Sequence, residues 1–179
     1  LGVELVPFSL IEDSKLPENI CGLLLGGGYP ENYAKELSCN ASMRQSVAHA
    51  IQGNMPCLAE CGGFLYLHDA ITDIDGEEWA MVSAVHATAA YQGKLQPRFG
   101  YITLEDGQTG MQIRGHEFHY YDSTDYGQEW TARKPLSSRH WSCMHKQGNL
   151  LAGFPHLYYA SNLEFAAEWV QRCRQWRKV

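Results

Sequence analysis

Two short apolar runs, each ending in a glycine-containing turn, constrain the fold of this chain more than any other feature. The runs are residues 20–25, followed by Gly26-Gly27-Gly28, and residues 55–60, followed by Cys61-Gly62-Gly63. Short continuous apolar runs are typical of parallel strands that are buried on both faces. A segment with helical periodicity, from about residue 31 to 52, separates them. The alternation predicts an α/β fold and places both turns at the carboxyl ends of strands, where open α/β sheets bind ligands.

The second half of the chain has a different pattern. From Ala70 onward, strand-like segments are separated by turns that contain Gly and Asp. We expect strands over residues 79–86, 98–105 and 111–121, and a hairpin formed by residues 141–145 and 150–154. A final amphipathic helix is expected to follow a cap at Asn162 and to end at about Arg177. These segments predict an antiparallel extension of the parallel sheet, within one domain over residues 1–179.

Size and charge exclude several classes of protein. The chain has 179 residues, 45% of them hydrophobic, and a formal net charge of -6, which disfavours nonspecific binding to nucleic acid. No apolar run is long enough to span a bilayer, and the first residues do not resemble a signal peptide, so we expect a cytoplasmic protein that does not bind membranes. The chain opens with Leu1 on a strand-like segment over residues 2–8, as expected for a piece of a longer polypeptide.

Cysteine usage singles out one residue. The six cysteines contain no CxxC pair, which disfavours a zinc ribbon or a redox motif, and five of them read as small buried hydrophobes. Cys61 is different because it lies where an apolar strand gives way to a helix. Such a turn exposes the side chain at its apex, and the helix N-terminus favours the thiolate. Cys61 is therefore a candidate nucleophile.

A cysteine nucleophile needs a base, because an unperturbed thiol is only a few per cent thiolate at neutral pH. Among the eight histidines, His49 and His68 fall within predicted helices and read as packing or surface residues. His116 and His119 lie in a strand-like segment with their side chains on opposite faces, which disfavours a shared metal site. His156 follows a strand and Pro155, and we consider it a candidate base, although the residues alone leave other histidines open.

The Gly26-Gly27-Gly28 turn has two interpretations that the residues alone do not separate. It is either a tight turn or a nest of backbone N–H groups that binds an anion. The chain contains neither GxxxxGK[ST] nor GxGxxG, so these glycines do not indicate a nucleotide site.

Several motifs together are more specific than any of these features alone. They are Leu25-Gly26-Gly27-Gly28-Tyr29-Pro30-Glu31, Ala59-Glu60-Cys61-Gly62-Gly63, Arg98-Phe99-Gly100-Tyr101, Gly115-His116-Glu117-Phe118-His119-Tyr120 and His156. In this order and rough spacing, the chain resembles the glutaminase domains of the cobyrinate a,c-diamide synthase family over nearly its whole length. The resemblance implies a three-layer, flavodoxin-like α/β fold of the class I glutamine amidotransferases, cobyric-acid-synthase type, with a mostly parallel sheet and an antiparallel extension.

The resemblance also implies roles for particular residues. Cys61 would attack the side-chain carbonyl of glutamine, and His156 would take the thiol proton and deliver it to the departing ammonia. Backbone N–H groups of Gly27, Gly28 and Gly62 would form the oxyanion hole. No metal or cofactor is implied within this domain. Ammonia would pass to an N-terminal P-loop synthetase domain, absent from this chain, which would use ATP and Mg²⁺ to amidate the a and c carboxylates of cobyrinate in cobalamin biosynthesis.

The sequence departs from related families in three ways. Conventional class I amidotransferases have a glutamate two residues after the histidine, whereas this chain has Tyr158, so we expect a catalytic dyad. The resembling family commonly has a second histidine at that position, and this chain lacks it. The first strand of the glutaminase domain is also missing, which would leave an exposed sheet edge. We expect either a homodimer or a domain cut at an imperfect boundary; a stable, monodisperse monomer in sedimentation would contradict this.

Other functions remain open at this stage. A related amidoligase would use the same glutaminase chemistry on cobyric acid precursors, on nickel sirohydrochlorin or on a cell-wall lipid. A noncatalytic interaction module of the same fold is a further alternative, although an intact Cys61 and His156 argue against it. A free cysteine hydrolase is the third, but the Gly-Tyr-Pro-Glu and His-Glu-Phe-His-Tyr segments favour the amidotransferase.

Overall fold

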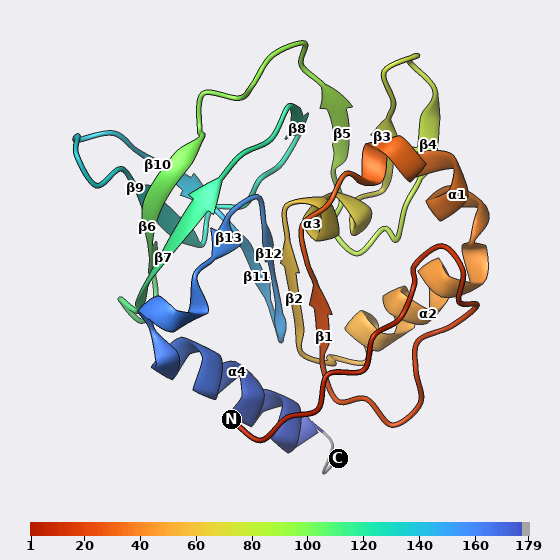
Figure 1. Cartoon of the computed structure of the whole chain (residues 1–179), viewed down its shortest axis with the longest axis horizontal. Helices are drawn as coiled ribbons and strands as arrows, with labels where there is room; N and C mark the ends of the chain where they lie inside the picture. Colours follow the sequence, from red (N-terminus) through yellow and green to blue (C-terminus); the bar gives the residue numbers. More distant parts are fainter. Residues whose placement is uncertain (177–179) are drawn as a thin grey trace.

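The computed structural model describes residues 1–176 and has a central parallel sheet at its core (Figure 1). The strands of this sheet are β1 (Leu23–Leu25), β2 (Cys57–Glu60), β12 (Leu150–Gly153) and β11 (His145–Gln147), in that order across the sheet. The first three run parallel, and β11 pairs antiparallel with β12. Their alignment brings the carboxyl ends of β1, β2 and β12 to one edge, as the sequence predicted.

Helices cover both faces of this sheet. They are α1 (Ala34–Cys39), α2 (Ala41–Gln52), α3 (Gly62–Tyr66), α4 (Leu163–Trp176) and two 3₁₀ helices, η1 (Pro30–Tyr33) and η2 (Tyr159–Ser161). Alternate residues of β2 point to opposite faces. Cys57 and Ala59 therefore belong to the core that contains Met43 of α2, whereas Leu58 belongs to the core that contains Phe165 of α4. Two hydrophobic layers flank one sheet, which confirms the three-layer α/β prediction.

The predicted antiparallel extension consists of two further sheets. One has five strands in the order β10 (His140–Cys143), β9 (Trp130–Arg133), β6 (Gly100–Asp106), β7 (Gln112–Glu117) and β13 (His156–Leu157). The other has the order β4 (Glu78–Ala80), β3 (Ala70–Thr72), β5 (Thr88–Tyr91) and β8 (Tyr121–Ser123). Apart from the parallel pair β3 and β5, the ladders of these sheets are antiparallel.

Local capping explains the break in the first helical segment. Asn40 ends α1 and caps α2, because its side-chain oxygen accepts a hydrogen bond from the Met43 N–H at 3.3 Å. Its amide nitrogen also donates to the carbonyl oxygens of Leu10 and Asp13, at 3.0 and 2.8 Å. At the other end of the chain, α4 follows Asn162 as predicted and is described to Trp176; its expected end at Arg177 lies outside the described residues.

Three strands predicted after residue 70 are wrong in detail. The strand expected over residues 111–121 ends with β7 at Glu117, and Tyr121 begins β8 of the other sheet. The strand expected over residues 79–86 is confined to β4, because the backbone after Ala80 turns away and bonds to the end of α3 and the residues after it. There Val82 N–H donates to the Tyr66 carbonyl at 3.1 Å, and Ser83 has φ +58°. The strand expected over residues 141–145 is split by Met144, at φ +63°, into β10 and β11. In these last two segments the sequence pattern is continuous, but a residue with positive φ, Ser83 or Met144, follows or divides the strand.

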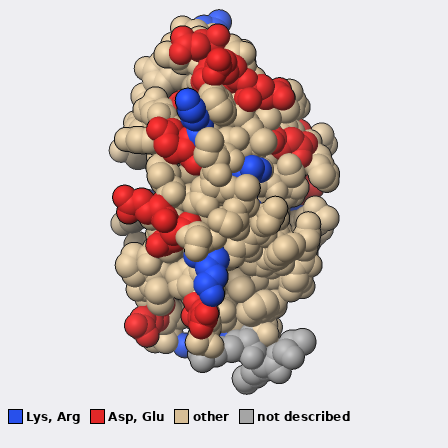
Figure 2. Space-filling view, turned by 90° about the vertical axis from the view of Figure 1, so that its right-hand side faces the viewer, with Lys and Arg blue, Asp and Glu red and all other residues tan. Residues whose placement is uncertain are grey.

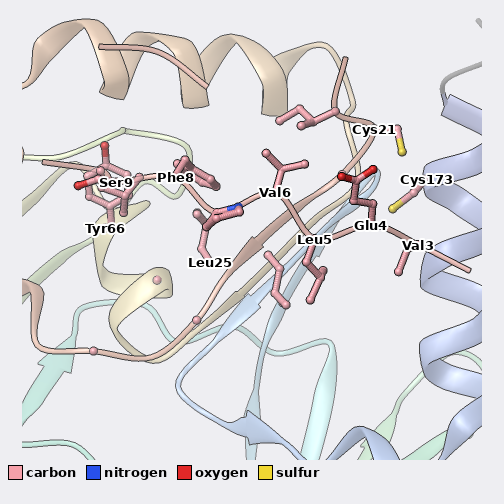
Figure 3. Close-up of a pocket in the computed structure, with 18 of the residues that line it drawn as sticks. Val3, Glu4, Leu5, Val6, Phe8, Ser9, Cys21, Leu25, Tyr66 and Cys173 are labelled. Atoms are coloured by element: carbon pink, nitrogen blue, oxygen red, sulfur yellow. The ribbon is translucent and has the colours of Figure 1, made fainter. Parts of the chain in front are cut away.

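A long groove runs beside the edge strand β1 (Figure 3). Its volume is about 1360 Å³, and it lies between the opening segment and the sheet. Residues 2–8 were predicted as a strand but form none, and β1 pairs with β2 alone among the described strands. Leu24 is 42% exposed on this edge. The described residues therefore leave the β1 edge open.

Surface charge is mixed on the side of the molecule where α1 lies. Figure 2 shows acidic and basic side chains interspersed with large uncharged areas, and no continuous basic patch on this face among the described residues. None of the helices described within residues 1–176 has the length and apolar character needed to cross a membrane.

Candidate active site

Three neighbouring strands deliver the predicted site residues to one edge of the central sheet. The Gly26-Gly27-Gly28 turn follows β1, Cys61 follows β2, and His156 lies three residues after the end of β12. Backbone hydrogen bonds tie the segments together: the Cys61 N–H donates to the Gly153 carbonyl at 2.8 Å, and the Gly63 N–H donates to the Gly26 carbonyl at 3.0 Å. The fold thus gathers the Cys61 turn, the His156 segment and the glycine turn at the edge where α/β sheets bind ligands.

Cys61 has a strained backbone. Its φ is +49° and its ψ is -104°, a conformation that residues with a side chain rarely adopt, and it directly precedes α3. The two glycines that follow explain how so sharp a turn packs. A Cβ on Gly62 would lie 2.6 Å from the Gly28 carbonyl oxygen, and one on Gly63 would lie 2.2 Å from that of Leu25. The turn after β2 is therefore in close contact with the turn after β1.

The Cys61 thiol is buried, which corrects two sequence-based expectations. The residue is only 7% exposed, and its sulfur lies 3.9 Å from the carbonyl oxygen of Phe118. Burial raises the thiol pKa to about 12; the nearby Glu31, Glu117 and Glu60 carboxylates act in the same direction, and the Gly62 backbone hydrogen bond opposes them. The apex is thus covered, and in the free protein desolvation outweighs the helix N-terminus.

The imidazole of His156 lies against the first glycine turn. A Cβ on Gly27 would come within 2.2 Å of His156 Cε1, so only glycine leaves room for the ring. The side chain is 38% exposed, and burial lowers its pKa, assisted by His116 and His119 and opposed by Glu117. His156 is therefore neutral near pH 7, the state that a base requires.

Glu60 is a residue of this site that the sequence reasoning missed. It ends β2, immediately before Cys61, and is almost fully buried. One carboxylate oxygen lies 3.9 Å from Nδ1 of His156 and accepts a hydrogen bond from the Leu157 N–H at 3.3 Å; the other accepts one from the Tyr159 hydroxyl. The only sequence signal was a charged residue at the end of an apolar run.

The Gly115-to-Tyr120 motif lies next to His156 and Cys61. His116 is in register with His156 across the β7–β13 ladder. His119 is buried, stacks on Phe154 with ring centroids 3.7 Å apart, and contacts Glu117 through Nε2 at 2.9 Å. Glu117 also forms an ion pair with Arg98 at 3.4 Å. The two histidines have separate partners, and His119 has a packing role.

The other sequence-based assignments have mixed outcomes. Cys57, Cys143 and Cys173 are buried as predicted, but Cys39 is exposed and Cys21 is only half-buried. His49 is on the surface and His68 is buried in the core, consistent with packing or surface roles. Tyr158, at the position of the conventional glutamate, is 61% exposed. The groove beside β1 is lined by Gly26–Gly28 and Gly62–Gly63 but by neither Cys61 nor His156.

Similarity to known proteins agrees with this arrangement. A solved glutamine amidotransferase matches with a TM-score of 0.61 over 87% of this chain and 80% of that one, at 17% identity, which shows the fold.

The sequence is also similar to curated proteins named cobyrinate a,c-diamide synthase. Those from Caldanaerobacter subterraneus and Fusobacterium nucleatum are each 37% identical, over 97% and 94% of this chain, and that from Priestia megaterium is 33% identical over 99%. This chain spans about 40% of the length of these relatives. A model of the CobB/CobQ-like glutamine amidotransferase domain matches residues 2–163. The chain therefore belongs to the CobB/CobQ-like glutamine amidotransferase family.

Proposed function

We propose that this chain is a glutaminase that hydrolyses glutamine through a thioester on Cys61 and releases ammonia. The supporting observation is the convergence of three segments at the carboxyl ends of β1, β2 and β12 around a strained cysteine. The buried thiol needs a base, and His156 is a neutral histidine at the same sheet edge. Because Tyr158 is exposed and aromatic, Cys61 and His156 act as a dyad.

In the first step, His156 takes the proton from the Cys61 thiol as the sulfur attacks the side-chain carbonyl carbon of glutamine. A carbon–sulfur bond forms, and the carbonyl oxygen becomes an oxyanion. Backbone N–H groups of Gly27, Gly28 and Gly62 stabilise that oxyanion, a contribution of about 3 kcal/mol per donor in well-formed sites. The tetrahedral species collapses when the carbon–nitrogen bond breaks and His156 returns the proton to the leaving nitrogen, which releases ammonia.

In the second step, water hydrolyses the thioester. His156 removes a proton from the water as it attacks the thioester carbon, and the carbon–sulfur bond then breaks. The proton returns to the sulfur, glutamate leaves, and Cys61 is restored as a thiol. The carboxylic acid formed gives its proton to ammonia in water, so the net reaction is glutamine plus water to glutamate plus ammonium, with atoms and charge balanced.

The names of the relatives support one use for this ammonia. We propose that it amidates the a and c carboxylates of cobyrinate, in an ATP-dependent reaction of a synthetase domain that is the partner of this one. Among residues 1–176 there is no group of three or more metal-ligating side chains that would hold an ion, and the sequence has no Walker A motif. In this proposal ATP and Mg²⁺ act in the synthetase domain, and neither hydrolysis step uses them.

Covalent labelling tests the proposed chemistry directly. The full-length protein that contains this domain is incubated with diazo-oxonorleucine, an electrophilic glutamine analogue, and the adduct is located by mass spectrometry. We expect one adduct, on Cys61, and protection by glutamine. Cys57 provides the matched control, because it lies four residues before Cys61, at the start of β2, and is fully buried. Absence of an adduct on Cys61 would overturn the proposed mechanism.

A further inference from the structure

We propose that Glu60 is a positioning residue that holds the imidazole of His156 through Nδ1, so that Nε2 is free to face the Cys61 thiol. This inference rests on the proposed glutaminase function. It assigns the orienting role to the residue that immediately precedes the nucleophile in sequence, at the end of β2. The exposed Tyr158, which occupies the position of the conventional glutamate, has no part in it.

The contacts of Glu60 fix its carboxylate in place. The Leu157 N–H donates to one oxygen at 3.3 Å, and the Tyr159 hydroxyl donates to the other. Both donors follow His156 closely in sequence, so the carboxylate is anchored to the same short segment that carries the imidazole. Hydrogen bonds to the ionised form oppose the effect of burial, which raises the pKa of this carboxyl.

The same oxygen that accepts from Leu157 lies 3.9 Å from His156 Nδ1. That separation is longer than a hydrogen bond, but catalytic hydrogen bonds are often long in free enzymes and shorten when substrate binds. A carboxylate at Nδ1 fixes the tautomer that leaves Nε2 unprotonated, the form that accepts a thiol proton. Gly27 packs against Cε1, the carbon between the two nitrogens, and limits the position of the ring at that edge.

A nucleophile and a positioning carboxylate at adjacent positions are compatible because the turn is strained. Along an ordinary strand, adjacent side chains point to opposite faces. Cys61 has φ +49°, which redirects the chain directly after Glu60. The unusual backbone therefore lets consecutive residues act on one imidazole, Glu60 at Nδ1 and Cys61 from the Nε2 side.

Charge changes at Glu60 provide a readout that a purely structural role would not move. The titratable groups that already shift the pKa of His156 are His116, Glu117 and His119, and all three are unchanged in Glu60 variants. Removing a carboxylate near Nδ1 destabilises the imidazolium, so the pKa of His156 falls further. The acid limb of the pH profile of glutamine kcat/KM should then move to lower pH.

The experiment compares variants of the full-length protein. In Glu60→Gln we expect kcat for glutamine hydrolysis to fall about 10- to 100-fold, with KM changed less than about threefold and the acid limb moved to lower pH. Glu60→Asp keeps the negative charge, but its side chain is one methylene shorter, so the carboxylate lies farther from His156. This variant should lower kcat and move the acid limb of the pH profile less than Glu60→Gln does. Tyr158→Phe is the control and should match the wild type.

The outcomes separate this inference from the proposed function. If wild-type Cys61 is labelled by diazo-oxonorleucine but a folded Glu60→Gln or Glu60→Asp protein keeps kcat within about twofold, the positioning role is wrong and the glutaminase stands. A loss of kcat in Glu60→Gln with an unmoved acid limb also contradicts it, because a structural role would suffice. If wild-type Cys61 is not labelled, the proposed function itself fails. If Glu60→Gln does not fold, the kcat of Glu60→Asp tests the positioning role instead.

Discussion

A buried cysteine lies at each end of strand β2, yet we propose a catalytic role for only one of them. Cys57 begins the strand inside the hydrophobic core, and Cys61 follows its last residue. Burial raises the thiol pKa to about 12 at both positions. The acidity of the thiols therefore does not distinguish them, and the difference lies in what surrounds each sulfur.

The surroundings differ in three respects. Cys57 has ordinary strand geometry, whereas Cys61 has a positive φ. Cys61 is followed by Gly62 and Gly63, which pack against the turn after β1. His156 follows the neighbouring strand β12, at the same carboxyl edge. In the proposed mechanism, a base and backbone donors make the buried Cys61 thiol a nucleophile, and its high pKa keeps it protonated until that base acts.

Serine substitutions at the two cysteines give the largest expected contrast. Cys61→Ser should lower glutamine-dependent activity of the full-length protein by about 10³-fold or more while ammonia-dependent synthesis continues. Cys57→Ser buries a hydroxyl in the core, so it should lower the free energy of unfolding by about 1–3 kcal/mol and keep kcat within about threefold.

Steady-state kinetics with glutamine and with ammonium, alongside urea unfolding, measure both effects. Equal loss of both activities in folded Cys61→Ser would contradict separate sites for ammonia production and use. Loss of glutamine activity in Cys57→Ser would remove the distinction between the two ends of β2.

Local patterns predicted the elements that carry the site. The apolar run before each glycine turn, the Asn162 cap and the α/β alternation are short-range signals, and they correctly located β1, β2 and α4. Cys61 could be selected because a cysteine between a strand and two glycines is unusual. His156 could be selected only with the help of the family resemblance, because the sequence has eight histidines and residue type alone does not distinguish them.

Tertiary packing determined what the sequence did not reveal. Glu60 contacts Leu157 and Tyr159, almost a hundred positions away, and no local pattern encodes that distance. The loop after β4 misled the strand prediction because Met81 and Val82 are buried without being in a strand. The sequence also predicted too low a pKa for Cys61. The thiol is buried by residues far away in sequence, such as Phe118, which follows β7 in another sheet.

Alanine substitutions in the glycine turn give the next largest contrast. Gly27→Ala places a methyl group within 2.2 Å of His156 Cε1, so the imidazole must shift. We expect kcat for glutamine hydrolysis to fall about 10- to 100-fold, since small misplacements of a catalytic group have effects of that size. Gly26→Ala is the matched control, because a Cβ there meets no atom within 4 Å. Equal activity of the two variants would show that contact with Gly27 does not position His156.

Alkylation as a function of pH gives the smallest effect and tests the resting state of the Cys61 thiol. Iodoacetamide reacts with thiolates. Because burial raises the Cys61 pKa to about 12, the labelling rate of the free protein should rise about tenfold per pH unit between pH 7 and 10. Peptide mass spectrometry separates Cys61 from Cys57, which is fully buried and should stay unlabelled, and from the exposed Cys39, which reports reagent quality. A rate at Cys61 that levels off near neutral pH would mean that His156 already holds its proton, and that the two ends of β2 differ in thiol acidity as well as in surroundings.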